Sequence, residues 1–183
     1  MKWIKDEDFI RGSIPMTKFD ARVLIMAVLE LEQGDVFLDV GAGTGSISIQ
    51  AALLGAEVYA IEKDQEGVGL IYQNADKFGV KVKTIHGTAP ADMQSVTGFN
   101  KCFIGGSAGK LEQIMDALDK KLEAGGTLAA SFIVPDNMVD FKRKLKELRY
   151  KEIEARLIQS SIMDNLGLLK ANNPIFIIKG KKQ

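Results

Sequence analysis

The chain has little of several residue types and features that would point to a function. It holds one cysteine, Cys102, and one histidine, His86, so an internal disulfide is impossible and no cluster has metal-ligand spacing. Lys and Arg together number 24, as do Asp and Glu, so no net charge attracts nucleic acid or an anionic membrane. This balance of charge does not exclude a local basic patch.

Long apolar runs are also missing. No apolar stretch reaches the length of about 18 residues that a membrane helix needs. The opening residues, MKWIKDEDFIRG, lack the apolar core of a signal peptide. These absences predict a cytoplasmic protein with no metal and with neither a nucleic acid nor a membrane as partner.

What the chain does have is the composition of a soluble globular protein, with 46% hydrophobic and 26% charged residues. At 183 residues it is long enough for one sizeable core and too short for two ordinary domains. We therefore expect one domain over 1–183, with a lead segment at 1–16.

Short β-like runs alternate with helical patterns along most of the chain. Such alternation predicts parallel strands joined by right-handed crossovers, while the last two strands, joined by a short loop, should pair antiparallel. The expected fold is an α/β, doubly wound, mostly parallel sheet of seven strands with an antiparallel last strand. We expect strands near 35–40, 56–62, 80–86, 99–105, 127–134, 150–160 and 174–179, and helices near 17–31, 46–54, 65–78, 107–126 and 138–148.

A glycine-rich loop, FLDVGAGTG at 37–45, joins the first expected strand to a helix. A phosphate-binding P-loop needs Lys and Ser or Thr after its last glycine, but Ser46 and Ile47 follow here. A dinucleotide fingerprint spaces its glycines as G-x-G-x-x-G, whereas these fall as G-x-G-x-G. A tight turn that binds nothing would also use glycine, so the loop alone does not establish a ligand.

An acidic residue, Glu62, stands 23 residues after Asp39 at the end of the second expected strand. In sheets of this kind such a residue accepts hydrogen bonds from the ribose hydroxyls of an adenosine cofactor. Together with the glycine spacing, Glu62 favours an adenosine cofactor other than a dinucleotide.

The glycine loop and the segment around Glu62 together resemble those of a known superfamily. LDVGAGTG followed by AIEKD is similar to motifs I and II of class I S-adenosylmethionine-dependent methyltransferases, whose seven-stranded sheet is the one expected here. The resemblance implies S-adenosyl-L-methionine as cofactor, with the loop near its methionine part and the acidic residue on its ribose.

A narrower resemblance spans nearly the whole chain. FIRGSIPMTKFDAR, GTAPADM, FIGGSAG and NNPIFI, in this order, resemble the decarboxylating cobalt-precorrin-6B methyltransferases of anaerobic cobalamin biosynthesis. The family methylates C-15 of the corrin macrocycle and removes carbon dioxide from the acetate at C-12. The resemblance implies a cobalt-precorrin tetrapyrrole as substrate and a homotetramer as assembly.

The resemblance also implies the cofactor contacts. These are Thr17, Gly41, Ala42, Gly43, Thr44, Gly45, Glu62 and Ala89. Thr17 could instead cap the helix that begins near it. Thr88 stands where related enzymes commonly have Asp, so a threonine hydroxyl would have to pair with the exocyclic amine of adenine.

Substrate contacts are expected around IGGSAG, where glycines free backbone N–H groups to bind carboxylates. Gly106 and Ser107 are the candidates, although Ser107 could be an ordinary helix cap. Arg11 and Lys18 could pair with carboxylates or be solvated. ANNP at 171–174 is interpreted as a turn, and no catalytic residue is assigned.

Three other functions stay open at this point. One is a class I methyltransferase that acts on transfer RNA or protein, and another is a non-catalytic module that retains the cofactor loop. A third, an NAD-dependent oxidoreductase, is disfavoured because Ser46 stands where the dinucleotide pattern has its third glycine.

Overall fold

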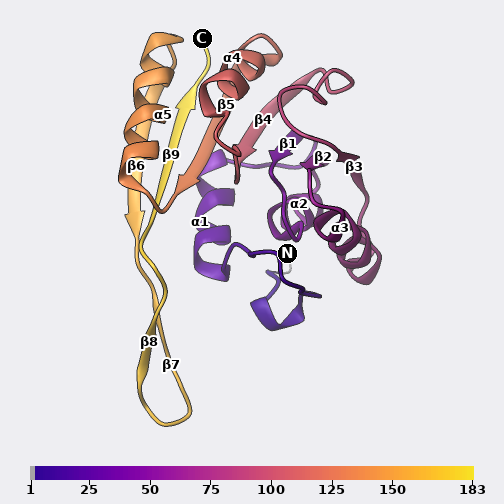
Figure 1. Ribbon diagram of the computed structural model, residues 1–183, viewed down its shortest axis with the longest axis vertical. Coiled ribbons are helices and arrows are strands. Elements are labelled where there is room, and N and C mark those ends of the chain that lie inside the picture. Colours follow the sequence, from indigo (N-terminus) through magenta and orange to yellow (C-terminus); the bar gives the residue numbers. More distant parts are fainter. Residues whose placement is uncertain (1–2) are drawn as a thin grey trace.

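The computed structural model describes residues 3–183, so residues 1–2 of the expected lead segment lie outside the described part. Its main sheet has seven strands in the order β3-β2-β1-β4-β5-β9-β6 (Figure 1). Neighbours among β1 to β5 pair parallel, and β9 runs antiparallel to both β5 and β6. The expected fold class is confirmed. The strands are β1 Val36–Val40, β2 Glu57–Glu62, β3 Val82–His86, β4 Phe99–Ile104, β5 Leu122–Phe132, β6 Lys151–Ile158 and β9 Ile175–Lys181.

Helices cover both faces of this sheet. Phe37 of β1 packs in a core cluster with α1 and α2, while its neighbour Leu38 packs in the cluster that includes α4 and α5. This alternation follows from the two-residue period of a strand, and it buries β1 on both faces. The helices are α1 Phe19–Leu29, α2 Ser46–Leu53, α3 Gln65–Phe78, α4 Leu111–Asp119 and α5 Pro135–Glu147. No helix in residues 3–183 is long and apolar enough to span a membrane.

The fourth helix is shorter than the sequence predicts. It begins at Leu111, because Ala108 and Gly109 adopt positive φ angles of 47° and 78° that a right-handed helix cannot contain. At its other end the chain turns at once into β5, where Leu122 pairs with Phe99 of β4. The glycine pair at 125–126 therefore lies inside a strand.

A small hairpin, formed by β7 Ser161–Met163 and β8 Leu169–Ala171, was not predicted. It links β6 to β9 and projects beyond the sheet (Figure 1). Its apolar side chains are exposed, including Leu166 at 84% and Leu169 at 71%, so no buried face marks it in the sequence.

The lead segment is tied to the helices by side chains from elsewhere in the chain. Asn74 of α3 accepts a hydrogen bond from the Ile10 N–H at 2.9 Å and donates one to the Ile10 carbonyl at 3.0 Å. The buried Arg22 of α1 donates to the carbonyls of Ile4 and Thr17. These bonds hold residues 10–18 close to the glycine loop, where the carbonyl of Pro15 lies 3.2 Å from a Cβ built on Gly43.

Candidate cofactor and substrate site

The glycine loop follows β1 directly and needs its glycines. Gly41, Gly43 and Gly45 have φ angles of 71°, 57° and 77°, in the left-handed region that glycine tolerates best. A Cβ on Gly41 would lie 2.7 Å from both the backbone nitrogen and oxygen of Gly106. The loop after β1 and the loop after β4 therefore pack backbone against backbone.

Glu62, at the end of β2, points its carboxylate at this loop. Its Oε2 accepts the Gly43 N–H at 2.7 Å, and its Oε1 accepts the Asp64 N–H at 2.9 Å. Glu62 is only 5% exposed, and each carboxylate oxygen keeps a further lone pair. The carboxylate is thus held in place with acceptor capacity left for the hydroxyls of a ligand.

Two cavities meet at this edge of the sheet. The larger has a volume of about 650 Å³ and the smaller about 350 Å³. They share six lining residues, Pro15, Gly41, Gly43, Gly105, Gly106 and Ser107. Such adjacent cavities suit two ligands that must come into contact.

Most residues predicted from the sequence line these cavities. Glu62, Thr88 and Ala89 line the smaller cavity, and Thr17, Ala42 and Lys18 line the larger one. Gly41, Gly43, Gly106 and Ser107 line both. In the described chain, Arg11, Thr44 and Gly45 line neither, and Gly45 is the N-cap of α2.

The capping alternatives for Thr17 and Ser107 are wrong. The N-cap of α1 is Lys18 and that of α4 is Lys110, and neither cap makes a side-chain hydrogen bond. Ser107 instead begins a turn, in which its carbonyl accepts the Lys110 N–H at 2.9 Å. Because α4 begins four residues later, Gly106 and Ser107 face the cavities from a loop rather than from a helix end.

Asp39 is a lining residue to which sequence reasoning assigned no role. It is 1% exposed, lines the larger cavity and accepts a 2.6 Å hydrogen bond from the Ser48 hydroxyl. Burial raises the pKa of Asp39 to about 7, partly offset by the bond from Ser48, and the charge of Glu62 raises it further. An acidic residue at the end of the first strand was the available sequence signal.

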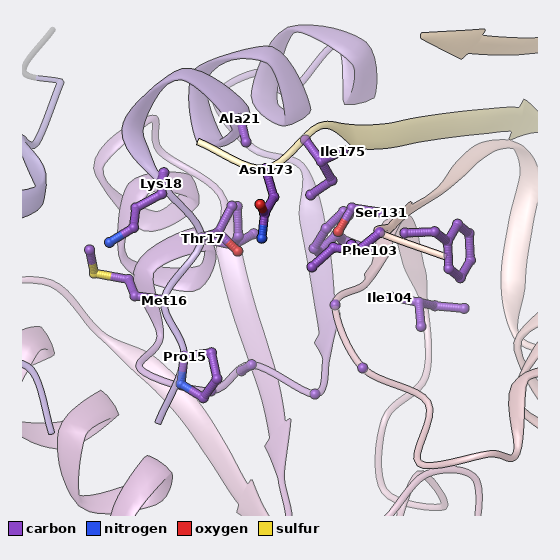
Figure 2. A pocket seen from close by; sticks show the side chains of 18 of the residues that line it. Pro15, Met16, Thr17, Lys18, Ala21, Phe103, Ile104, Ser131, Asn173 and Ile175 are labelled. Atoms are coloured by element: carbon purple, nitrogen blue, oxygen red, sulfur yellow. The ribbon is translucent and has the colours of Figure 1, made fainter. Parts of the chain in front are cut away.

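The residues of the outer wall of the larger cavity were also not predicted from the sequence. Ser131 stands at the end of β5, Ile133, Val134 and Asn137 around the start of α5, and Asn173 just before β9. Figure 2 shows the Asn173 amide directed into the cavity, toward the Thr17 hydroxyl. The interpretation of ANNP as no more than a turn therefore overlooked a lining side chain.

Comparison with solved structures defines the fold. An S-adenosylmethionine-dependent O-methyltransferase from Thermotoga maritima is 20% identical with a TM-score of 0.76, over 94% of this chain and 67% of that one. At that identity the likeness shows the fold alone. The chain has the Rossmann-like methyltransferase fold.

More similar proteins identify the family. A precorrin-6y C5,15-methyltransferase from Geobacter metallireducens is 28% identical with a TM-score of 0.93, over 99% of this chain and 97% of that one. A probable cobalt-precorrin-6B C(15)-methyltransferase (decarboxylating) from Sulfolobus acidocaldarius is 38% identical over 98% of this chain and 97% of its own. Its counterpart in Salmonella typhimurium is 35% identical over 98% and 96%. Residues 8–176 match the family described as precorrin methyltransferase domain, and the chain belongs to that family.

Proposed function

We propose that this chain is an S-adenosylmethionine-dependent enzyme that methylates C-15 of a cobalt-precorrin and removes carbon dioxide from its C-12 acetate. The observation that carries the proposal is the likeness, over 98% of the chain, to relatives named cobalt-precorrin-6B C(15)-methyltransferase (decarboxylating). The C-12 acetate as the group that is lost is what the family resemblance implies. These relatives have no additional domain of any size, because the match also covers 96% or more of their own length.

The smaller cavity suits the adenosine part of the cofactor, whose use the fold and the methyltransferase relatives imply. Glu62 would accept hydrogen bonds from the ribose hydroxyls, Ala89 would lie against adenine, and the Gly41–Gly45 loop would hold the methionine part. Gly41 and Gly43 fit this role because they line both cavities and present backbone without side chains. When bound, S-adenosylmethionine would supply an electrophilic methyl group at its sulfonium.

The larger cavity would hold the macrocycle beside that methyl group, with Gly106 and Ser107 at the junction. The protein's main task is then to position the reacting carbon, which supplies roughly 7–11 kcal/mol in well-oriented reactions. Each turnover adds a methyl cation to the macrocycle and removes carbon dioxide from a carboxylate. The charges therefore balance without an acid or base on the enzyme, and a proton shift within the product converts the remaining methylene to a methyl group.

The rival functions lack a supporting observation of this kind. A tRNA (m1A58) methyltransferase from Aquifex aeolicus shares the fold at 16% identity, which carries no argument about substrate. The homotetramer, the cytoplasmic location, and the cofactor and substrate contacts of individual residues remain predictions.

Calorimetric titration tests the cofactor half of the proposal. S-adenosylmethionine and S-adenosylhomocysteine should bind the wild-type chain, and NAD should not. Glu62→Ala should raise the Kd of S-adenosylhomocysteine roughly tenfold to a hundredfold, because it removes charge-assisted hydrogen bonds worth about 1.5–3 kcal/mol each. Glu57→Ala, at the other end of β2 and exposed, is the matched control and should leave the Kd unchanged.

Mass spectrometry tests the substrate half. Incubated with the enzyme and S-adenosylmethionine, cobalt-precorrin-6B should gain one methyl group and lose carbon dioxide. A gain of methyl alone would refute the decarboxylase assignment. Tight binding of NAD, or a Glu62→Ala variant that binds S-adenosylhomocysteine as the wild type does, would refute the cofactor assignment.

A further inference from the structure

The outer wall of the larger cavity carries polar side chains that have no partner within the protein. In the described part of the chain, Ser131, Asn137 and Asn173 make no side-chain hydrogen bond, although all three line the cavity. Thr17, Ser131 and Asn173 all line this cavity, and Figure 2 shows the Asn173 amide turned toward it. Unpaired donors around a hollow of about 650 Å³ are suited to a polar ligand.

The position of Asn173 is set by the base of the hairpin. The neighbouring Asn172 donates its backbone N–H to the Ser160 carbonyl at 2.8 Å and its side-chain amide to the Ser160 hydroxyl at 3.0 Å. On the other side, Pro174 restricts the backbone and β9 begins at Ile175. These constraints hold the Asn173 backbone while leaving its side chain free for a ligand.

The charges around this cavity are few. Among its lining residues in the described chain, only Lys18 and Asp39 are ionisable. Lys18 extends toward Met16 and away from Asn173 in Figure 2, and Asp39 lies at the buried end of β1 beside Ser48. Among the lining residues that the structure describes, no cation therefore faces Asn173, although the proposed substrate carries many carboxylates.

Apolar side chains complete this part of the wall. Ile133 and Val134 line the cavity and are 65% and 50% exposed, and Ile175, two residues after Asn173, also lines it. A flat macrocycle resting on Ile133 and Val134 would cover this exposed surface. It would also exclude water from a carboxylate held nearby, and desolvation favours the loss of charge from that group.

Resting on the function proposed above, we propose that the Asn173 amide and the Ser131 hydroxyl hold the acetate group that leaves as carbon dioxide. Neutral donors orient a carboxylate but stabilise its charge less than an ion pair does, because an ion pair adds the Coulomb attraction of a full positive charge. An ion pair would be strongest with the carboxylate and would weaken as its charge left, so it would slow the reaction. The absence of a cation at this point therefore serves decarboxylation.

The step balances without any further reactant. The bond between the acetate methylene and the carboxylate carbon breaks, carbon dioxide leaves, and the electron pair passes into the conjugated macrocycle. The positive charge that methylation adds to the macrocycle is cancelled by that pair. Asn173 and Ser131 hold the carboxylate out of the plane of the macrocycle, and they take up no proton.

Asn173→Lys is the decisive variant, because it places a cation at the proposed carboxylate site. Methylation of cobalt-precorrin-6B should continue, while decarboxylation slows about tenfold and the methylated product that retains its carboxylate accumulates in the mass spectrum. Asn173→Ser, which shortens the side chain without adding a charge, should slow decarboxylation less than Asn173→Lys does. Asn165→Lys, in the turn between β7 and β8 and outside the cavity lining, is the matched control and should change nothing.

A binding measurement tests the site without turnover. Cobalt-precorrin-6B, which still carries the C-12 acetate, is titrated into the S-adenosylhomocysteine complex, where no methyl group can be transferred, and its binding is followed by absorbance. Asn173→Asp should raise its Kd about tenfold or more through like-charge repulsion, and Asn173→Lys should not raise it.

The outcomes separate this inference from the proposed function. A wild-type enzyme that leaves the precorrin unmethylated refutes the proposed function, whatever the variants do. An Asn173→Lys enzyme that binds S-adenosylhomocysteine normally and decarboxylates at the wild-type rate overturns the inference alone. Unchanged binding of cobalt-precorrin-6B by Asn173→Asp also overturns it.

Discussion

The smaller and the larger cavity are built from different kinds of chain. Around the smaller one, Glu62 and Ala89 are buried, and the lining comes mainly from the loops that follow β1, β2, β3 and β4. The outer wall of the larger one is exposed, as at Ile133 and Asn173, and it comes from segments that meet only in the folded chain. The difference indicates that the cofactor side is coupled to folding stability, whereas the substrate side is free to vary with the ligand.

The largest expected effect concerns Asp39 and pH. The folded protein keeps Asp39 protonated until its raised pKa of about 7, while the unfolded chain ionises it near 3.8. Between these values the unfolded state binds fewer protons, so this residue makes stability fall as pH rises. From about pH 4 to about pH 7 the loss is up to about 4 kcal/mol, at about 1.4 kcal/mol for each pKa unit.

Urea unfolding of the wild type and of Asp39→Asn over this pH range measures the effect. Asparagine keeps the shape and an acceptor for the Ser48 hydroxyl but cannot ionise. The variant should lose less stability than the wild type as pH rises. Parallel curves for the two proteins would show that Asp39 is already ionised at low pH and that burial does not dominate its titration.

Gly41→Ala should have the next largest effect. The left-handed φ of 71° costs an L-residue about 1–2 kcal/mol, and the added methyl would overlap the Gly106 backbone at 2.7 Å. We expect the free energy of unfolding to fall by about 3 kcal/mol and S-adenosylhomocysteine binding to weaken.

Gly34→Ala separates the two causes. Gly34 has a φ of 93°, but a Cβ there would meet nothing within 4 Å. Urea unfolding should therefore show a loss of only about 1–2 kcal/mol, with binding unchanged. Equal losses of unfolding free energy in Gly41→Ala and Gly34→Ala would mean that the close packing of the loops after β1 and β4 contributes nothing to stability.

The smallest effect is expected in the hairpin. Leu166 is 84% exposed, so Leu166→Ser should change the free energy of unfolding by less than about 0.5 kcal/mol in urea. Binding of S-adenosylhomocysteine should also be unchanged. A loss above about 1 kcal/mol would show that the hairpin is covered in solution. The contrast between a buried cofactor side and an exposed substrate side would then be wrong.

Local pattern was sufficient for much of the fold. The helix expected at 65–78 is α3 with those bounds, because an apolar stripe and the Gly79 stop are features of neighbouring residues. The helix expected at 107–126 was wrong at both ends. Its first residues adopt a turn, and its last ones join β5 through pairing with β4, a partner that no short window contains.

The amino-acid sequence by itself determined the alternation of strands and helices, the glycine loop with Glu62, and the family resemblance. Each of these depends on residues close together in the chain or on motifs in a set order. Only the tertiary structure decided that Asp39 is a buried acid and that Asn173 and Ser131 face one cavity. Burial and convergence depend on which distant segments pack together, because neither desolvation nor a shared wall is a property of a short stretch of sequence.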